Sequence, residues 1–176
     1  DQHGITVMMT YIVGYPGETG QTIENTARFM NEMKIGHASS SYQLFPLYIS
    51  PFSDLMKEEF RREWNLKGVY DKWNHFTMDY PGSISAGYEL FRKTIHVPYH
   101  YSQERTWYNR EKFSYEVRRD LFGLRRDLTL SIIEGHDNGR KLRTINSMLG
   151  QMGKANVKVP VDFPGKLHVG FKKPKA

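Results

Sequence analysis

The sequence predicts an α/β fold that begins with a βαβ unit, continues as α-helices and ends in a basic, irregular tail. Three observations support this. A continuous apolar run, residues 5–13, stops at a turn rich in glycine and proline. Apolar residues at helical spacing follow it, and a second short strand comes within the first 46 residues. Because parallel strands need a crossover connection, strand, helix and strand in this order predict a parallel sheet.

The first strand, residues 5–13, is apolar on both faces, which is typical of a buried parallel strand. A helix over residues 21–33 follows, with its apolar positions at Ile23, Ala27, Met30 and Met33. The second strand is expected at residues 41–46. A parallel sheet of only two strands would leave both edges open, so the sequence predicts that the chain is a piece of a longer protein.

After Pro46 the pattern changes to helices. Asp54 is expected to cap a helix that carries Phe60 and Trp64, and residues 68–82 are expected to be irregular. Further helices are predicted over residues 83–95, 103–134 and 141–149. The predicted organisation is therefore a βαβ part over residues 1–52, an α-helical extension over 53–150 and a tail over 151–176.

The composition excludes several kinds of chemistry. The chain of 176 residues contains no cysteine, which excludes disulfides, thiolate zinc sites, a catalytic cysteine and a self-contained iron–sulfur cluster. No apolar run reaches the roughly 20 residues that a membrane helix needs. We therefore expect no membrane span.

The net charge of +6 lies mostly in the tail. Residues 151–176 hold six lysines against the single acid Asp162, together with three prolines. Clustered lysines can neutralise phosphates, but this tail has no arginine and only Phe163 and Phe171 to stack on bases. A nucleic-acid partner is therefore not expected.

The loop over residues 14–22, Gly-Tyr-Pro-Gly-Glu-Thr-Gly-Gln-Thr, is the most informative segment. A glycine-rich turn from a parallel strand into a helix is a general site for anions and nucleotides. A phosphate-binding P-loop is one interpretation, but five residues separate Gly14 from Gly20, and Gln21 stands where the lysine is required. A tight turn chosen only for its backbone geometry is the second.

The third interpretation is a resemblance. The run Thr-Tyr-Ile-Val-Gly-Tyr-Pro-Gly-Glu-Thr, residues 10–19, resembles the late-barrel signature of radical S-adenosylmethionine (SAM) enzymes, and is most similar to the cobalamin-binding branch. Two further segments are similar to that branch in the same order, residues 42–51 and residues 73–78. The resemblance covers residues 4–95 and implies the late βα units of a partial parallel (β/α) barrel, a TIM-barrel-like fold.

The resemblance also implies a partial SAM site. Ile12 and Gly14 would border the adenine, while the loop residues would shape the turn, with Glu18 anchoring backbone groups near the helix start. The end of the second strand would cover the other side of the nucleoside by apolar contact and backbone hydrogen bonds. The implied cofactor-binding residues are Ile12, Gly14, Pro16, Gly17, Glu18, Leu44, Phe45 and Pro46. None of them would be catalytic, because the cofactor supplies the radical.

The cluster itself is not provided by this chain. In the family three cysteines ligate a [4Fe–4S] cluster, and these are absent here. The resemblance implies that the upstream part of the same polypeptide binds the cluster and any cobalamin, and that the intact protein is a cytoplasmic enzyme of SAM-dependent radical or methyl-transfer chemistry with an unknown substrate. The competing hypothesis is a non-catalytic α/β–α binding or scaffold module that uses its long helix and basic tail.

Other candidate residues have simpler interpretations. His75 could line a substrate or cobalamin pocket, but we expect a packed, hydrogen-bonded surface histidine, because no carboxylate lies near it in sequence. His96 and His100 are four residues apart, yet Pro98 between them disrupts the helical geometry that metal chelation would need. The acids of residues 54–63 and the arginines of residues 118–126 are expected to form solvated helix surfaces.

Overall fold

The computed structural model describes residues 7–33, 40–100 and 115–136, with residues 139, 140, 143, 144 and 147. The described residues form two compact units. One contains residues 9–33 and 43–96, and the other contains 7–8, 40–42, 97–100 and the residues from 115 onward. The predicted tail, residues 103–114 of the predicted long helix and most of the predicted helix 141–149 lie outside the described residues.

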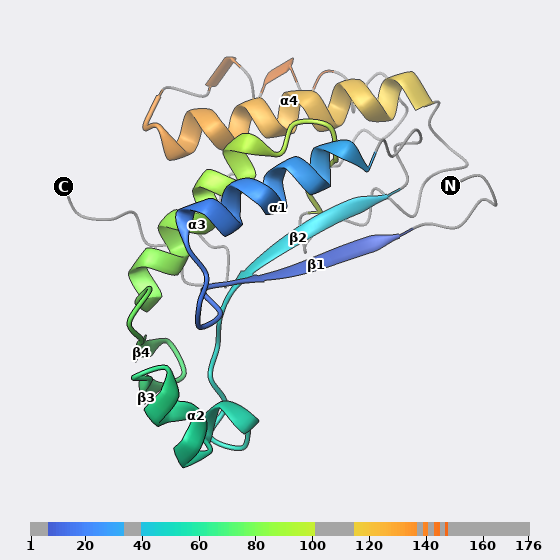
Figure 1. Cartoon of the computed structure of the whole chain (residues 1–176). Coiled ribbons are helices and arrows are strands. Elements are labelled where there is room, and N and C mark those ends of the chain that lie inside the picture. The colour runs from blue at the N-terminus through green and yellow to red at the C-terminus, as the bar shows by residue number, and fades with distance from the viewer. Residues whose placement is uncertain are drawn as a thin grey trace. The chain divides into compact units, whose positions relative to one another are not determined.

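The sheet consists of two strands, β1 (Met8–Val13) and β2 (Ser41–Pro46) (Figure 1). Ser41 N–H donates to Val7 O at 3.0 Å, and Leu47 N–H donates to Val13 O at 2.7 Å. The residue offset is the same at both ends of the pair, which is the pattern of parallel strands. The α/β class with a small parallel sheet is therefore confirmed, and the described residues form no closed barrel.

The prediction that the first strand is buried on both faces is wrong for this chain. Met8 and Ile12 are 49% and 56% exposed, whereas Val13 is 1% exposed. Successive strand residues point to opposite faces, so one face of β1 packs and the other stays open. The apolar residues of β1 therefore form both an exposed surface, with Met8 and Ile12, and part of the core, with Val13.

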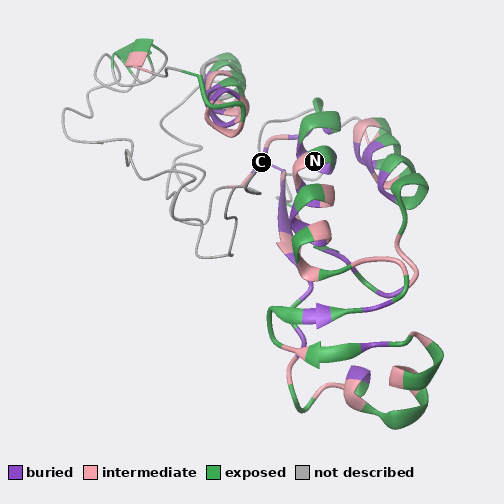
Figure 2. Cartoon of the chain, turned by 90° about the vertical axis from the view of Figure 1, so that its left-hand side faces the viewer, coloured by how far each residue is buried: buried purple, intermediate pink, exposed green. Residues whose placement is uncertain are grey.

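Two helices of this unit pack against each other, α1 (Gly20–Glu32) and α3 (Tyr80–Lys93) (Figure 1). Each has a buried stripe and an exposed face (Figure 2). Thr19 caps α1 through a reciprocal bond with Thr22. Asn31 connects the two helices, because its side chain donates to Lys93 O at 2.8 Å and accepts from Ile95 N–H at 2.9 Å.

Residues 54–82 differ from the prediction in two ways. The helix expected from Asp54 is divided into a 3₁₀ turn, η1 (Asp54–Met56), and a short helix, α2 (Glu58–Glu63). Asp54 does not cap it, because its carboxylate pairs with Lys57 at 2.8 Å. The stretch expected to be irregular contains an antiparallel pair, β3 (Lys67–Val69) and β4 (Lys72–Asn74), and the first turn of α3.

This region has its own small core. Trp73 of β4 is 3% exposed and lies in a cluster of buried side chains, with half-buried aromatic residues packed around it. The buried members are Leu47, Ile49, Leu55, Leu66 and Trp73. The core therefore forms where the chain leaves β2, directly beside the carboxyl end of the sheet.

The second unit contains α4 (Tyr115–Ile133). Leu121 and Leu128 are buried on it, with Leu124 and Ile132 packed against them. These spacings of three, four and seven residues match the stripe that the sequence predicts. Among the described helices, none combines the length and the apolarity that crossing a bilayer requires.

Candidate functional site

The loop between β1 and α1 is a tight turn with two glycines in the left-handed region. Gly14 and Gly17 have φ of +96° and +93°, and Glu18 N–H donates to Tyr15 O at 2.9 Å. Residues with a Cβ rarely adopt such φ values. The two glycines that the sequence places here are therefore required by the path of the backbone.

The carboxylate of Glu18 folds back over the loop and accepts a hydrogen bond from Gly14 N–H. It thus joins the start of the loop to its end. Burial raises the pKa of Glu18, and the hydrogen bond from Gly14 opposes part of that rise. Glu18 was expected to anchor backbone groups near the helix start, and the backbone group that it binds is Gly14, directly after β1.

The raised pKa of Glu18 predicts how stability changes with pH. A carboxyl with a raised folded-state pKa contributes stability that is complete below its unfolded pKa of 4.5 and is lost as the pH rises through the folded pKa. Glu18→Gln keeps an acceptor for Gly14 and removes the charge. Between about pH 4 and pH 7, the variant should gain about 0.5 kcal/mol relative to the wild type in urea unfolding. Glu18→Ala should be less stable than Glu18→Gln over this whole pH range. A Gln variant whose stability falls relative to the wild type as the pH rises would contradict the prediction.

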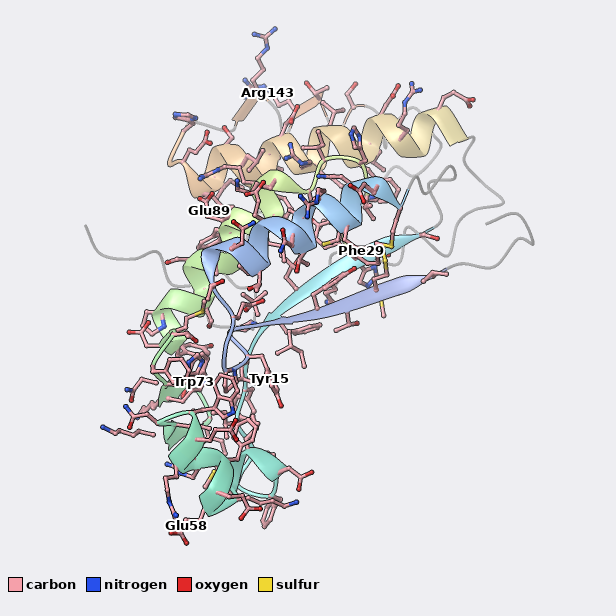
Figure 3. All side chains as sticks on the ribbon, viewed as in Figure 1. Tyr15, Phe29, Glu58, Trp73, Glu89 and Arg143 are labelled. Carbon is pink, nitrogen blue, oxygen red and sulfur yellow. The ribbon has the colours of Figure 1, made fainter. Side chains whose placement is uncertain are left out.

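Two tryptophan rings occupy the space beside the loop glycines. A Cβ added to Gly14 would lie 2.5 Å from Ser83 Cβ and 2.8 Å from the Trp73 ring. A Cβ added to Gly17 would lie 2.9 Å from the Trp64 ring. Figure 3 shows Tyr15 and Trp73 beside the turn that follows β1. Gly14 is therefore packed against α3 and β4, and Gly17 against the residue that ends α2, with no room for a side chain at either position.

The segment 73–78 also binds the loop by hydrogen bonds. His75 Nε2 lies 3.0 Å from Gly14 O, and Gly17 N–H donates to Thr77 Oγ1 at 3.3 Å. Trp73 Nε1–H donates to Leu47 O at 2.8 Å, just beyond the end of β2. The segment 73–78 therefore binds the backbone directly after β1 and directly after β2.

The open face of β1 ends at this loop. The constant offset between the strands places Ile12 opposite Phe45, so their side chains share a face. Ile12 is 56% exposed and Phe45 is half-buried, whereas Val13 on the other face is buried. Two apolar side chains therefore flank the start of the glycine loop at the carboxyl edge, where parallel sheets bind ligands.

The eight residues that the sequence predicts for a cofactor site fall into two groups. Ile12, Phe45, Gly17 and Glu18 are exposed or half-buried at the carboxyl edge, whereas Gly14 is buried. Leu44, Pro46 and Pro16 are buried, so their side chains support the edge and are not exposed on it. The edge offers apolar contact, which suits a planar, weakly polar ring better than a phosphate.

Sequence reasoning missed the residues that hold the loop. Trp73 and Thr77 belong to residues 68–82, which were expected to be irregular, and Trp64 belongs to the helix expected from Asp54. His75 was expected to be packed and hydrogen-bonded, and it is, but it is 5% exposed and not at the surface. The available signal was the density of aromatic and hydrogen-bonding residues over 73–78.

In the part of the chain that the structure describes, no three His, Asp or Glu side chains converge as metal ligands. The chain has no cysteine, so its own residues do not fit an iron–sulfur cluster. Ile12 and Phe45 offer apolar contact to a planar ring such as adenine, whereas the Gly14 backbone is already bonded to Glu18 and His75. Burial lowers the pKa of His100. His96 is exposed.

No family model matches the chain, and no curated protein or solved structure matches it either. The assignment of a function therefore rests on the loop, the sheet edge and their chemistry.

Proposed function

We propose that this chain forms the adenine side of an S-adenosylmethionine site in a radical SAM enzyme. The observation that carries the proposal is the position of the glycine loop. It follows a parallel strand at the carboxyl edge, is fixed by Glu18 and the segment 73–78, and adjoins the open apolar pair Ile12 and Phe45. In partial parallel barrels this edge is where the cofactor binds.

Each part of the site has a defined task in this proposal. Ile12 and Phe45 lie side by side on one face of the sheet, so both contact the same side of the adenine. Glu18 holds the loop and does not touch the ligand. When bound, SAM supplies radical or methyl-transfer chemistry, and the residues of this chain orient it and exclude water from one side.

The remaining assignments belong to the same proposal. The βαβ unit is the late part of a partial (β/α) barrel, and the upstream part of the same polypeptide provides the [4Fe–4S] cluster, any cobalamin and the other half of the SAM site. The open face of β1 fits this arrangement, because a barrel interior is lined by the sheet face that no helix covers. A cytoplasmic location is part of the proposal.

Binding of 5′-deoxyadenosine to the ¹⁵N-labelled chain tests the site directly. Half a site should bind weakly, with a Kd of about 1 mM, or about −4 kcal/mol. We expect amide shifts confined to Ile12, Gly14 and Phe45 and their neighbours. Ile12→Ser should weaken binding about fivefold, because it removes apolar contact.

Ile95 provides the matched control, because it is as exposed as Ile12, at 56%, and lies beyond the end of α3. Ile95→Ser should leave binding unchanged. Absence of shifts at saturating 5′-deoxyadenosine, or equal effects of the two variants, would contradict the adenine assignment.

The sequence encoded upstream of Asp1 separates this proposal from a non-catalytic binding or scaffold module. A Cys-x3-Cys-x2-Cys run about 100 to 150 residues earlier is expected, because the resemblance of residues 10–19 to radical SAM enzymes implies three cysteines that ligate one cluster. An upstream sequence without it would favour the scaffold module.

A further inference from the structure

One imidazole lies at the centre of the contacts that fix the glycine loop. His75 is 5% exposed and stacks on the Trp73 ring, with centroids 5.1 Å apart and planes 6° from parallel. Its Nε2 faces Gly14 O at 3.0 Å. Its Nδ1 faces three groups of its own turn, the N–H groups of Thr77 and Met78 and the Thr77 hydroxyl.

The partners determine which nitrogen carries the proton. A carbonyl oxygen only accepts, so Nε2 must donate to Gly14 O. Backbone N–H groups only donate, so Nδ1 must accept from Thr77 and Met78. The structure thus requires the neutral imidazole with its proton on Nε2. Both nitrogens are engaged, so His75 is not free to ligate a metal or to act as a general base.

The same imidazole affects the loop at a second point. Thr77 Oγ1 lies 3.0 Å from His75 Nδ1 and accepts from Gly17 N–H at 3.3 Å. When the hydroxyl donates to Nδ1, hydrogen bonds connect Gly17, Thr77, His75 and Gly14 in one chain. Such chains strengthen one another in a buried setting.

We propose that His75 is a positioning residue: by donating to Gly14 O it fixes the loop in the orientation that an adenosyl ligand needs. That the ligand is an adenosyl group rests on the proposed function, whereas the fixing of the loop by His75 does not. The direct bond to Gly14 is the essential one, because Gly14 is the residue at which the backbone leaves the sheet beside Ile12.

Two substitutions separate the roles of the two ring nitrogens of His75. In His75→Gln the side-chain amide reaches Gly14 O from the position of Nε2, but no acceptor replaces Nδ1. In His75→Asn the amide oxygen replaces Nδ1, but nothing reaches Gly14. We expect 5′-deoxyadenosine to bind about fivefold more weakly to the Asn variant and within about twofold of the wild type to the Gln variant.

A readout without ligand tests the loop by itself. The ¹³C resonance of the Gly14 carbonyl should move upfield in His75→Asn, where the hydrogen bond is lost, and should stay near the wild-type position in His75→Gln. The long-range ¹H–¹⁵N spectrum of the wild type should show a protonated Nε2 and an unprotonated Nδ1 for His75.

The outcomes distinguish the two proposals. If the wild type binds no 5′-deoxyadenosine, the adenine assignment fails, and the carbonyl shift of Gly14 alone decides whether His75 positions the loop. If that resonance is the same in the Asn variant as in the wild type, or if Asn and Gln weaken binding equally, the positioning role of His75 is overturned.

Discussion

Replacement of Gly14 by alanine is expected to destabilise the protein by about 3 kcal/mol or more. Two independent terms contribute. A residue with a Cβ at a φ of +96° is strained by about 1–3 kcal/mol. The new methyl group would also lie 2.5 Å from Ser83 Cβ and 2.8 Å from the Trp73 ring, and overpacking of this kind costs about 1–3 kcal/mol.

Gly20 is the matched control for Gly14. It begins α1 six residues later, and a Cβ added to it meets nothing within 4 Å. Gly20→Ala should therefore leave stability unchanged or raise it by about 0.5 kcal/mol, because alanine reduces the freedom of the unfolded chain. Urea unfolding of both variants measures the difference, and a Gly14→Ala protein as stable as Gly20→Ala would refute the packing described for the loop.

Truncation of Trp73 to alanine is expected to cost about 3–5 kcal/mol, the range found for large buried aromatic residues. The ring is 3% exposed, fills the space beside Gly14 and stacks on His75. Its removal should open a cavity at the centre of the small core beside the sheet. The expected result is a large fall in the urea midpoint, together with loss of 5′-deoxyadenosine binding.

Trp73→Phe isolates the hydrogen bond from the packing. Phenylalanine keeps much of the ring but leaves Leu47 O without its donor at 2.8 Å, which should cost about 1–3 kcal/mol. Trp64→Phe is the control, because Trp64 is half-buried and stacks on the exposed Phe76. It should cost less than about 1.5 kcal/mol. Equal losses in the two Phe variants would mean that the bond to Leu47 contributes little.

Much of the fold could be predicted from local pattern. The apolar run before Gly14, the helical spacing of Ile23, Ala27 and Met30 and the second strand at residues 41–46 predict a parallel βαβ unit, and the structure has it. These features depend on neighbours in sequence, so a single sequence carries them. The loop glycines could also be predicted from local sequence, because a tight turn after a strand needs residues with positive φ.

Residues 54–82 were predicted less well, and both a local ion pair and contacts distant in sequence explain why. Asp54 was expected to cap a helix, but its carboxylate pairs with Lys57, and the helix is interrupted there. The strands β3 and β4 have only three residues each, too short for a recognisable alternation. Their pairing is stabilised by the burial of Trp73 against residues after β2, which the local sequence does not show.

The sequence by itself determined the βαβ unit, the glycine turn and the absence of thiolate chemistry, because periodicity, backbone freedom and composition are local properties. Only the tertiary structure decided what fixes that turn. The segment 73–78 returns across about 60 residues of chain to hold Gly14 and Gly17. A hydrogen bond between groups so far apart in sequence exists only once the core has formed around Trp73, and no pattern of neighbouring residues encodes it.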